Sequence, residues 1–181
     1  MLAIFFYVGA EVIAIDTLIP YGNYWNIPTG TSHYFGVYAL VALLLGYFCG
    51  IIFVPKVISQ RKALVVQLFL SVALVVVALC TSGMVSVFAI ICLSFAHAIM
   101  WPAIWPLSIH DLGEHTEFGS ALLIMAIAGG AVMPLIYGKI ADMVNPHVAY
   151  AILFVCYAYI LFFATVGYRF DGKQKSLKEN E

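Results

Sequence analysis

Six long apolar runs, separated by short polar or charged stretches, dominate this sequence of 181 residues. Each run approaches the roughly 20 residues that an α-helix needs to cross a hydrocarbon layer of about 30 Å. Helices are expected because unpaired backbone groups are costly in lipid, and the runs lack the alternating pattern of a membrane barrel. Only 9% of the residues are charged, too few to cover a water-facing surface, and the mean hydropathy is +1.03. The sequence predicts an all-α membrane protein with spans at 2–21, 34–55, 63–81, 85–107, 118–144 and 148–168.

Basic residues gather on one side of the predicted bundle, because an even number of spans puts both termini on the same side. Lys56, Arg61 and Lys62 follow the second span, and the C-terminal segment carries four more of the eight basic residues. The positive-inside bias predicts that this side is cytoplasmic. We therefore expect a multi-pass protein of the inner (plasma) membrane with a six-span domain at 1–170 and a short cytoplasmic tail at 171–181.

The stretch HDLGEH, from His110 to His115, concentrates two histidines and two acids in an otherwise apolar chain. Zinc proteases use H-E-x-x-H or H-x-x-E-H, whereas the spacing here is H-x-x-x-E-H. On a continuous helix the two histidines would point about 140° apart. A loop between two spans is the favoured interpretation, with no metal, cofactor or nucleic acid expected. A membrane metalloenzyme is kept as a remote alternative.

Glu11 lies near the middle of the first predicted span, in the stretch FFYVGAEVIAID. An acid at this depth costs a few kcal/mol on insertion scales, so it needs a partner or a water-filled cavity. This makes Glu11 a candidate functional residue. The alternative is a protonated, hydrogen-bonded residue that only packs two helices together.

The fourth predicted span carries an unusual cluster of residues in the stretch FAHAIMWPAIWPLSI. Each proline removes a helix hydrogen bond, so this helix must bend or open near Pro102 and Pro106. Broken helices of this kind mark binding sites in transporters. Trp101 and Trp105 share one helix face and suit stacking on a sugar ring, although ordinary packing is the alternative.

Small residues share one face of the fifth predicted span, and Gly46 and Gly50 show the same spacing in the second. A face without bulk lets a neighbouring helix approach closely, or lets the helix flex. The second and fifth spans both have a face of small residues, and the first and fourth spans both carry buried polar residues. The pattern indicates a three-plus-three inverted repeat, as in half of a transporter. The fifth-span face consists of Ala126, Gly130, Pro134 and Gly138.

The chain resembles the sugar transporters of the major facilitator superfamily, in the fucose permease and glucose/galactose transporter group. Three stretches carry the resemblance: FFYVGAEV at 5–12, GYFCGIIFVPKVISQRKAL at 46–64, and WPAIWPLSIHDLGEHTEFGSALLIMAIAGGAVMPLIYGKIAD at 101–142. The third is the most specific. The resemblance implies that these six spans are the C-terminal half of a twelve-span protein. The start on an apolar helix then suggests a truncated reading frame, whose missing N-terminal half holds the family's main proton-coupling acids.

The resemblance implies sugar transport by alternating access, as a symport with a cation that is expected to be a proton. It places the first, second, fourth and fifth spans around the cavity and the third and sixth toward lipid. The implied substrate contacts are Tyr7, Glu11, His97, Trp101, Trp105, Met125 and Gly129. The candidate gating and hinge residues are Gly46, Gly50, Lys56, Arg61, Pro102, Pro106, Gly130 and Pro134.

Two positions depart from the pattern of this group. Members often have an arginine after the glycine that corresponds to Gly46, whereas this chain has Tyr47. The cytoplasmic gate is then expected to use Lys56 and Arg61. Fucose-permease-like members tend to have an amide where Glu11 stands, which favours a glucose- or galactose-type hexose over fucose. A six-span structural or assembly protein that never transports is the alternative function.

Overall fold

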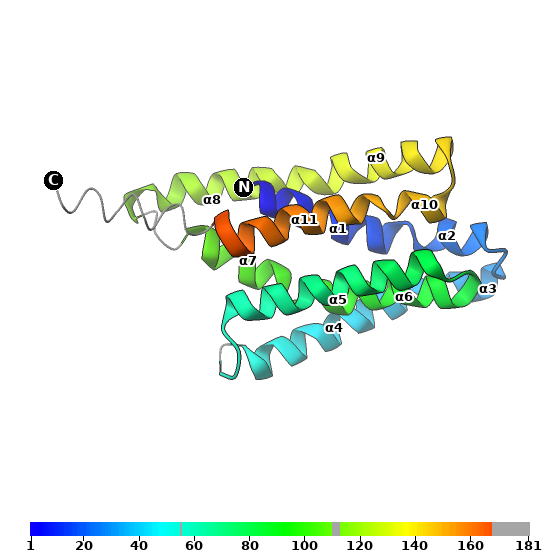
Figure 1. Ribbon diagram of the computed structural model, residues 1–181, viewed down its shortest axis with the longest axis horizontal. Coiled ribbons are helices and arrows are strands. Elements are labelled where there is room, and N and C mark those ends of the chain that lie inside the picture. Colours follow the sequence, from blue (N-terminus) through cyan, green and yellow to red (C-terminus); the bar gives the residue numbers. More distant parts are fainter. Residues whose placement is uncertain (55, 110–112, 168–181) are drawn as a thin grey trace.

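The computed structural model describes residues 1–54, 56–109 and 113–167, and within these ranges the chain forms helices and connecting turns without β-strands. The helices run roughly side by side in an elongated bundle (Figure 1). Five stretches are long and apolar enough to cross a membrane, and a bent helix pair at the N-terminus supplies a sixth. These six correspond to the six predicted spans.

The first three spans connect through a loop at one end of the bundle and a turn at the other. The first span comprises α1 (Leu2–Asp16) and α2 (Leu18–Tyr24), which are bent by 50°. The second comprises α3 (Thr29–Ser32) and α4 (Phe35–Phe53), and the third is α5 (Gln60–Cys80). We call the end that bears Lys56, Arg61 and Lys62 the basic end, and the end where α2, α3 and α10 lie the distal end (Figure 1).

The last three spans are each interrupted. The fourth comprises α6 (Gly83–His97) and α7 (Met100–Ile109). The fifth follows the 3-10 turn η1 (Gly113–His115) and comprises α8 (Thr116–Met125), the 3-10 turn η2 (Ala126–Ala128) and α9 (Gly129–Met143). The sixth comprises α10 (Pro146–Ala149), α11 (Ile152–Phe162) and the π-helical turn η3 (Phe163–Gly167).

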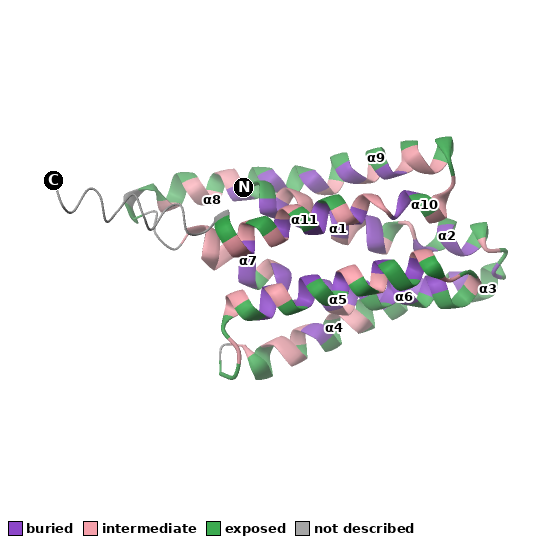
Figure 2. Cartoon of the chain, in the orientation of Figure 1, coloured by how far each residue is buried: buried purple, intermediate pink, exposed green. Residues whose placement is uncertain are grey.

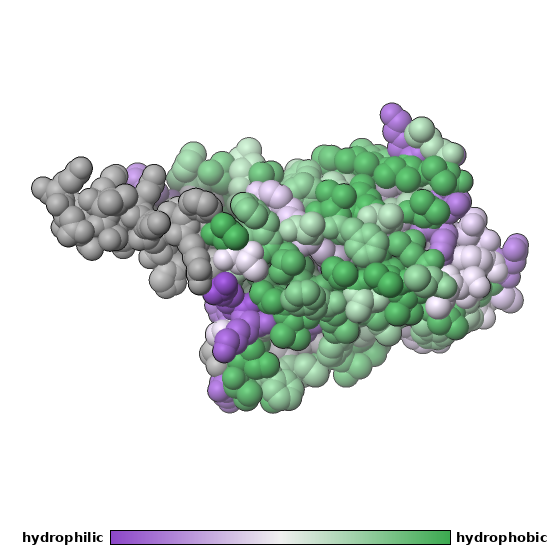
Figure 3. All heavy atoms as spheres, viewed as in Figure 1, coloured by the Kyte–Doolittle hydropathy of each residue, from purple (hydrophilic) through white to green (hydrophobic). Residues whose placement is uncertain are grey.

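Helices α1 and α6 form the centre of the bundle. Helix α6 packs against α4, α5 and α1, and α1 packs in turn against α9 and α11. Buried residues are concentrated on these two helices and on the faces that meet them (Figure 2). The sides of the bundle are largely apolar and hydrophilic residues gather near its ends (Figure 3), which is the surface of a membrane-spanning bundle.

Prolines explain two of the helix breaks. Pro102 has no N–H to donate to the carbonyl of Ala98, and the break between α6 and α7 lies at Ala98 and Ile99. The bend expected in the fourth span is therefore present, while Pro106 is accommodated inside α7. Pro20 stands in the same relation to Asp16, next to the break at Thr17, which the sequence-based prediction missed.

Two glycines bring helices into close contact, and one of them, Gly46, belongs to a predicted small face. A Cβ atom on Gly46 of α4 would lie 2.6 Å from the backbone oxygen of Phe95 on α6. A Cβ atom on Gly129 of α9 would collide with the backbone oxygen of Phe5 on α1. Gly138 has nothing within 4 Å of that position. Close approach, the first of the two predicted uses of a small face, thus occurs at Gly46. It also occurs at Gly129, which the sequence had assigned to substrate contact and not to a small face.

We expect Gly129→Ala to destabilise the bundle by about 1–3 kcal/mol, because the obstructing atom is backbone and cannot rotate away. Gly138→Ala in the same helix is the matched control and should be neutral or slightly stabilising, because alanine is the better helix former. Thermal unfolding in detergent measures both. Equal melting temperatures for the two variants would contradict the close approach of α9 to α1.

Candidate functional site

An acid and two tyrosines meet where α1 faces α4. Tyr7 and Glu11 stand one turn apart on α1, and the Tyr7 hydroxyl and the Glu11 carboxylate are close enough to interact. Tyr47 of α4 is close enough to interact electrostatically with Glu11. Tyr7 is buried, whereas Glu11 and Tyr47 are each partly exposed. The carboxylate and the Tyr47 hydroxyl are thus polar groups that a ligand can reach.

Two tryptophans of the broken fourth span lie near Tyr7. The rings of Trp101 and Trp105 stack with centroids 5.6 Å apart and an interplanar angle of 24°. The Tyr7 ring lies 6.1 Å from the Trp101 ring, which connects the tryptophans to α1. Both tryptophans are partly exposed. Together they offer a flat apolar surface next to Tyr7, which is also the neighbour of Glu11.

His97 lies behind this surface and is fully buried. Its Nε2 atom is hydrogen-bonded to the Tyr157 hydroxyl of α11 at 2.7 Å, and Tyr157 also interacts with Ser71 of α5. The edge of the His97 ring meets the Tyr7 ring at 6.2 Å. His97 Nδ1 has no hydrogen-bond partner among the described residues. His97 therefore supports Tyr7 from the protein interior and does not face the accessible side of the site.

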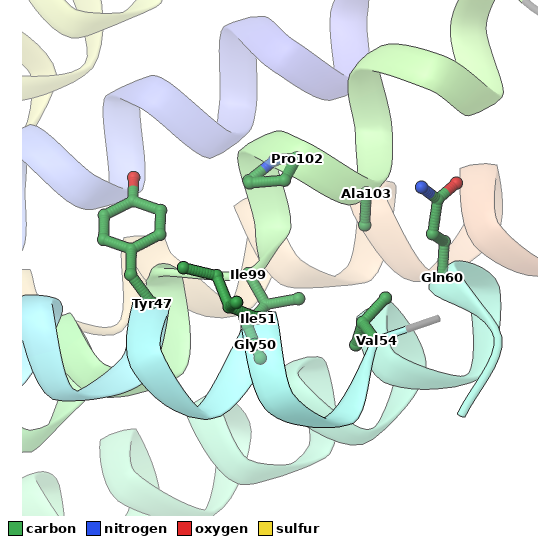
Figure 4. A pocket seen from close by; sticks show the side chains of 8 residues that line it. All are labelled: Tyr47, Gly50, Ile51, Val54, Gln60, Ile99, Pro102 and Ala103. Atoms are coloured by element: carbon green, nitrogen blue, oxygen red, sulfur yellow. The ribbon is translucent and has the colours of Figure 1, made fainter. Parts of the chain in front are cut away.

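A pocket of about 180 Å³ adjoins the tryptophan-bearing segment, between α4, the start of α5 and α7. Tyr47 lies at one end and Gln60 at the other (Figure 4), so polar groups mark both ends of a mostly apolar pocket. Its other lining residues are Gly50, Ile51, Val54, Ile99, Pro102 and Ala103. The opened α6–α7 junction thus contributes both to the pocket and to the tryptophan surface.

The structure brings together five of the seven predicted substrate contacts and places the other two elsewhere. Met125 lies at the end of α8 and is 65% exposed. Gly129 is buried against Phe5, where it serves helix packing. The five that meet are Tyr7, Glu11, His97, Trp101 and Trp105.

The candidate gating residues take up several different positions. Gly50 approaches Ile99 at the α6–α7 junction, and Gly130 approaches Val8 and Val12 of α1. Lys56 is exposed at the basic end. The remaining positions are Arg61, whose Nε donates to the Ala164 carbonyl at 2.9 Å and so joins α5 to η3, and Pro134, which is inside α9.

Two residues of the site were missed in the sequence. Tyr47 was read only as a departure from a family arginine, although it follows Gly46 on a face already singled out. Tyr157 lies in an otherwise apolar run, and a buried tyrosine hydroxyl generally needs a hydrogen-bond partner. That rule points to a polar partner for Tyr157, but only the structure identifies it as His97.

Within the described ranges, no group of three or more histidine, cysteine or acidic side chains is arranged to hold a metal ion. Half of the HDLGEH stretch, residues 110–112, falls outside those ranges. His115 ends the turn η1 and is exposed.

The chain is similar in sequence to known sugar transporters, although no protein-family model matches it. It is 34% identical over 176 residues to a glucose/galactose transporter of Brucella abortus, covering 92% of this chain and 41% of that protein. It is 30% identical over 168 residues to an L-fucose–proton symporter of Escherichia coli, covering 91% of this chain and 38% of that one. The chain thus spans about two fifths of the length of these relatives.

Solved structures agree with the sequence comparison. A crystal structure of a major facilitator superfamily transporter of fucose, in the outward conformation, matches with a TM-score of 0.83 and 28% identity. A variant of the Escherichia coli fucose–proton symporter matches with a TM-score of 0.86 and the same identity. Each match covers 94% of this chain and 41% of the solved one. These relatives are transporters and not enzymes, and the chain is a relative of the sugar transporters of the major facilitator superfamily with the fold of one six-helix half of such a protein.

Proposed function

We propose that the chain forms one side of a transmembrane path for a hexose-type sugar, which it helps to move by alternating access. The observation that carries the proposal is that Tyr7 is a neighbour both of the Glu11 carboxylate and of the stacked Trp101 and Trp105 rings. A sugar has both hydroxyl groups and an apolar ring face.

In this proposal each part of the site has a separate task. Glu11 accepts hydrogen bonds from sugar hydroxyls, and the Tyr47 hydroxyl donates or accepts another. Trp101 and Trp105 receive the apolar face of the ring. Tyr7 and His97 fix the positions of Glu11 and Trp101 from behind. Met125, on the exposed side of α8, contributes where the rest of the transport path closes over the site.

The relatives also support a cation-coupled mechanism, because one of them is named as a sugar–proton symporter. We propose proton symport across the plasma membrane, with the basic end in the cytoplasm as the positive-inside bias predicts. The part of the relatives' length that this chain does not match supplies the opposite wall of the path. The break near Pro102, the helix around Pro134, and the close contacts at Gly46 and Gly130 are where the half flexes during transport.

Uptake of labelled sugars by proteoliposomes tests this proposal. The vesicles hold the chain alone, or the chain together with the N-terminal half of a glucose/galactose relative. We expect accumulation of glucose or galactose, or of fucose, that collapses when a protonophore is added, and no accumulation of a labelled amino acid. If none of the sugars accumulates in either preparation and none changes tryptophan fluorescence, a six-span structural role replaces transport.

A further inference from the structure

A second polar cluster lies at the distal end of the bundle, away from the proposed sugar site. Its centre is His147, the second residue of α10. His147 Nε2 is 3.1 Å from the Leu79 carbonyl, and Nδ1 is 2.8 Å from the Tyr21 hydroxyl of α2. The Tyr21 hydroxyl also contacts Ser86 Oγ of α6, and Ser86 donates in turn to the Ala78 carbonyl at 2.7 Å. Four consecutive hydrogen bonds therefore connect four of the six spans.

Whether all four hydrogen bonds have a proton to share depends on the charge of His147. Both carbonyls can only accept hydrogen bonds. The Ser86 hydroxyl therefore donates its proton to the Ala78 carbonyl, and the Nε2–H group of His147 donates to the Leu79 carbonyl. Because Ser86 has no second proton, Tyr21 must donate to Ser86 Oγ. The Tyr21 hydroxyl then has no proton left to donate to His147. The hydrogen bond between them therefore requires His147 Nδ1 to carry a proton and donate it to the Tyr21 oxygen. All four bonds form together only when both ring nitrogens of His147 carry protons.

The groups around His147 come from every element that packs against α10. Helix α2 contributes Tyr21 and Tyr24, and the Trp25 ring that follows meets the His147 ring edge-on at 5.3 Å. Helix α9 carries Tyr137, which donates to the Pro146 carbonyl at 3.0 Å. The charged residues nearest in sequence to these elements are Asp16, at the end of α1, and Lys139 and Asp142, near the end of α9.

We propose that His147 is a proton-binding site at the distal end of the bundle, and that its protonation fastens α2 to α5, α6 and α10 through Tyr21 and Ser86. When the proton leaves, one of the two Tyr21 contacts loses its shared hydrogen and α2 is held less firmly. Helix α2 begins at the break next to Thr17, so it can move without disturbing Glu11 on α1. The proposal does not depend on sugar transport.

Fluorescence of Trp25 reports the protonation directly, because imidazolium quenches a neighbouring indole more strongly than neutral imidazole does. In the purified chain with Trp101→Phe and Trp105→Phe, Trp25 is the last of the 3 tryptophans. We expect its emission to fall through one transition between about pH 8 and about pH 5, the interval in which histidine changes charge. His147→Gln should abolish this transition, and His33→Gln, at another histidine of the distal end, should leave it unchanged.

Thermal unfolding at the two ends of this pH interval gives an independent test in the otherwise unchanged chain. The complete network exists at the acid end, so we expect its stabilising contribution to be lost as the pH rises. Ser86→Ala frees the Tyr21 proton for neutral His147, and it should therefore remove most of this pH dependence. A transition that persists in His147→Gln, or a pH dependence that Ser86→Ala leaves intact, would overturn the proposal.

Discussion

Replacing Glu11 with glutamine should reduce uptake of glucose or galactose by about 10- to 100-fold, because a hydrogen bond to a charged group contributes about 1.5–3 kcal/mol. The amide keeps the size of the carboxylate and can still accept a bond from Tyr7. Loss of uptake would therefore report the negative charge and not the packing of α1. Initial uptake rates in the reconstituted proteoliposomes, measured over a range of sugar concentrations, give the effect.

Asp16→Asn is the matched control for this substitution. Asp16 is the last residue of the same helix and is exposed, so neutralising it removes the same charge away from the site. Uptake should stay within about twofold of the parent, as expected for an exposed residue without a structural role. Tyr47→Phe should produce a smaller loss than Glu11→Gln, because it removes a neutral hydrogen-bonding group. Unchanged uptake in Glu11→Gln would leave Glu11 as a packing residue, the alternative raised by the sequence.

The second large effect is expected at Tyr157, whose hydroxyl is the partner of His97 inside the bundle. Tyr157→Phe leaves the fully buried His97 ring without this bond, and Nδ1 already has no partner in the described part of the chain. An unsatisfied buried polar group costs about 1–3 kcal/mol. We expect the free energy of unfolding to fall by that amount, which a lower melting temperature would show. We also expect weaker sugar uptake, because His97 supports Tyr7.

A double substitution separates this explanation from a general loss of packing. His97→Met together with Tyr157→Phe removes both polar partners, and it should be less destabilising than Tyr157→Phe alone. Tyr159→Phe on the same helix is the matched control, since the Tyr159 ring packs on Phe6 and Phe162 at the partly exposed side of α11. If the double variant is the least stable of the three, the His97–Tyr157 bond is not the source of the effect.

The six spans follow from the sequence because a membrane helix must hold its own backbone hydrogen bonds within a long apolar run. The bend of the fourth span was predictable for a similar reason, since Pro102 cannot donate to Ala98. Pro20 carries the same signal for the break at Thr17, but the predicted first span ran without interruption from residue 2 to residue 21. Local chemistry thus gave the spans and one of the two breaks that lie next to a proline.

The partners inside the bundle could not be predicted, because they depend on contacts between distant spans. Glu11, Trp101 and Trp105 attract attention as polar or bulky residues within their own helices. Tyr47 and Tyr157 gain their roles only from Glu11 and His97, which lie on other spans. Gly129 shows the same limit, since no pattern within α9 indicates that the backbone of Phe5 lies against it.

The order in which the spans are synthesised gives the sixth span a special place in biogenesis. Thr17, Tyr21 and His97 all emerge early, yet each has a hydrogen-bond partner that lies beyond Asn145. A nascent chain that stops before α10 therefore leaves these groups in the bilayer without their Tyr150, His147 and Tyr157 partners. Completion of the last span is the step at which an inserted chain acquires these three contacts, and a nascent chain truncated there should be recognised by membrane quality-control proteases.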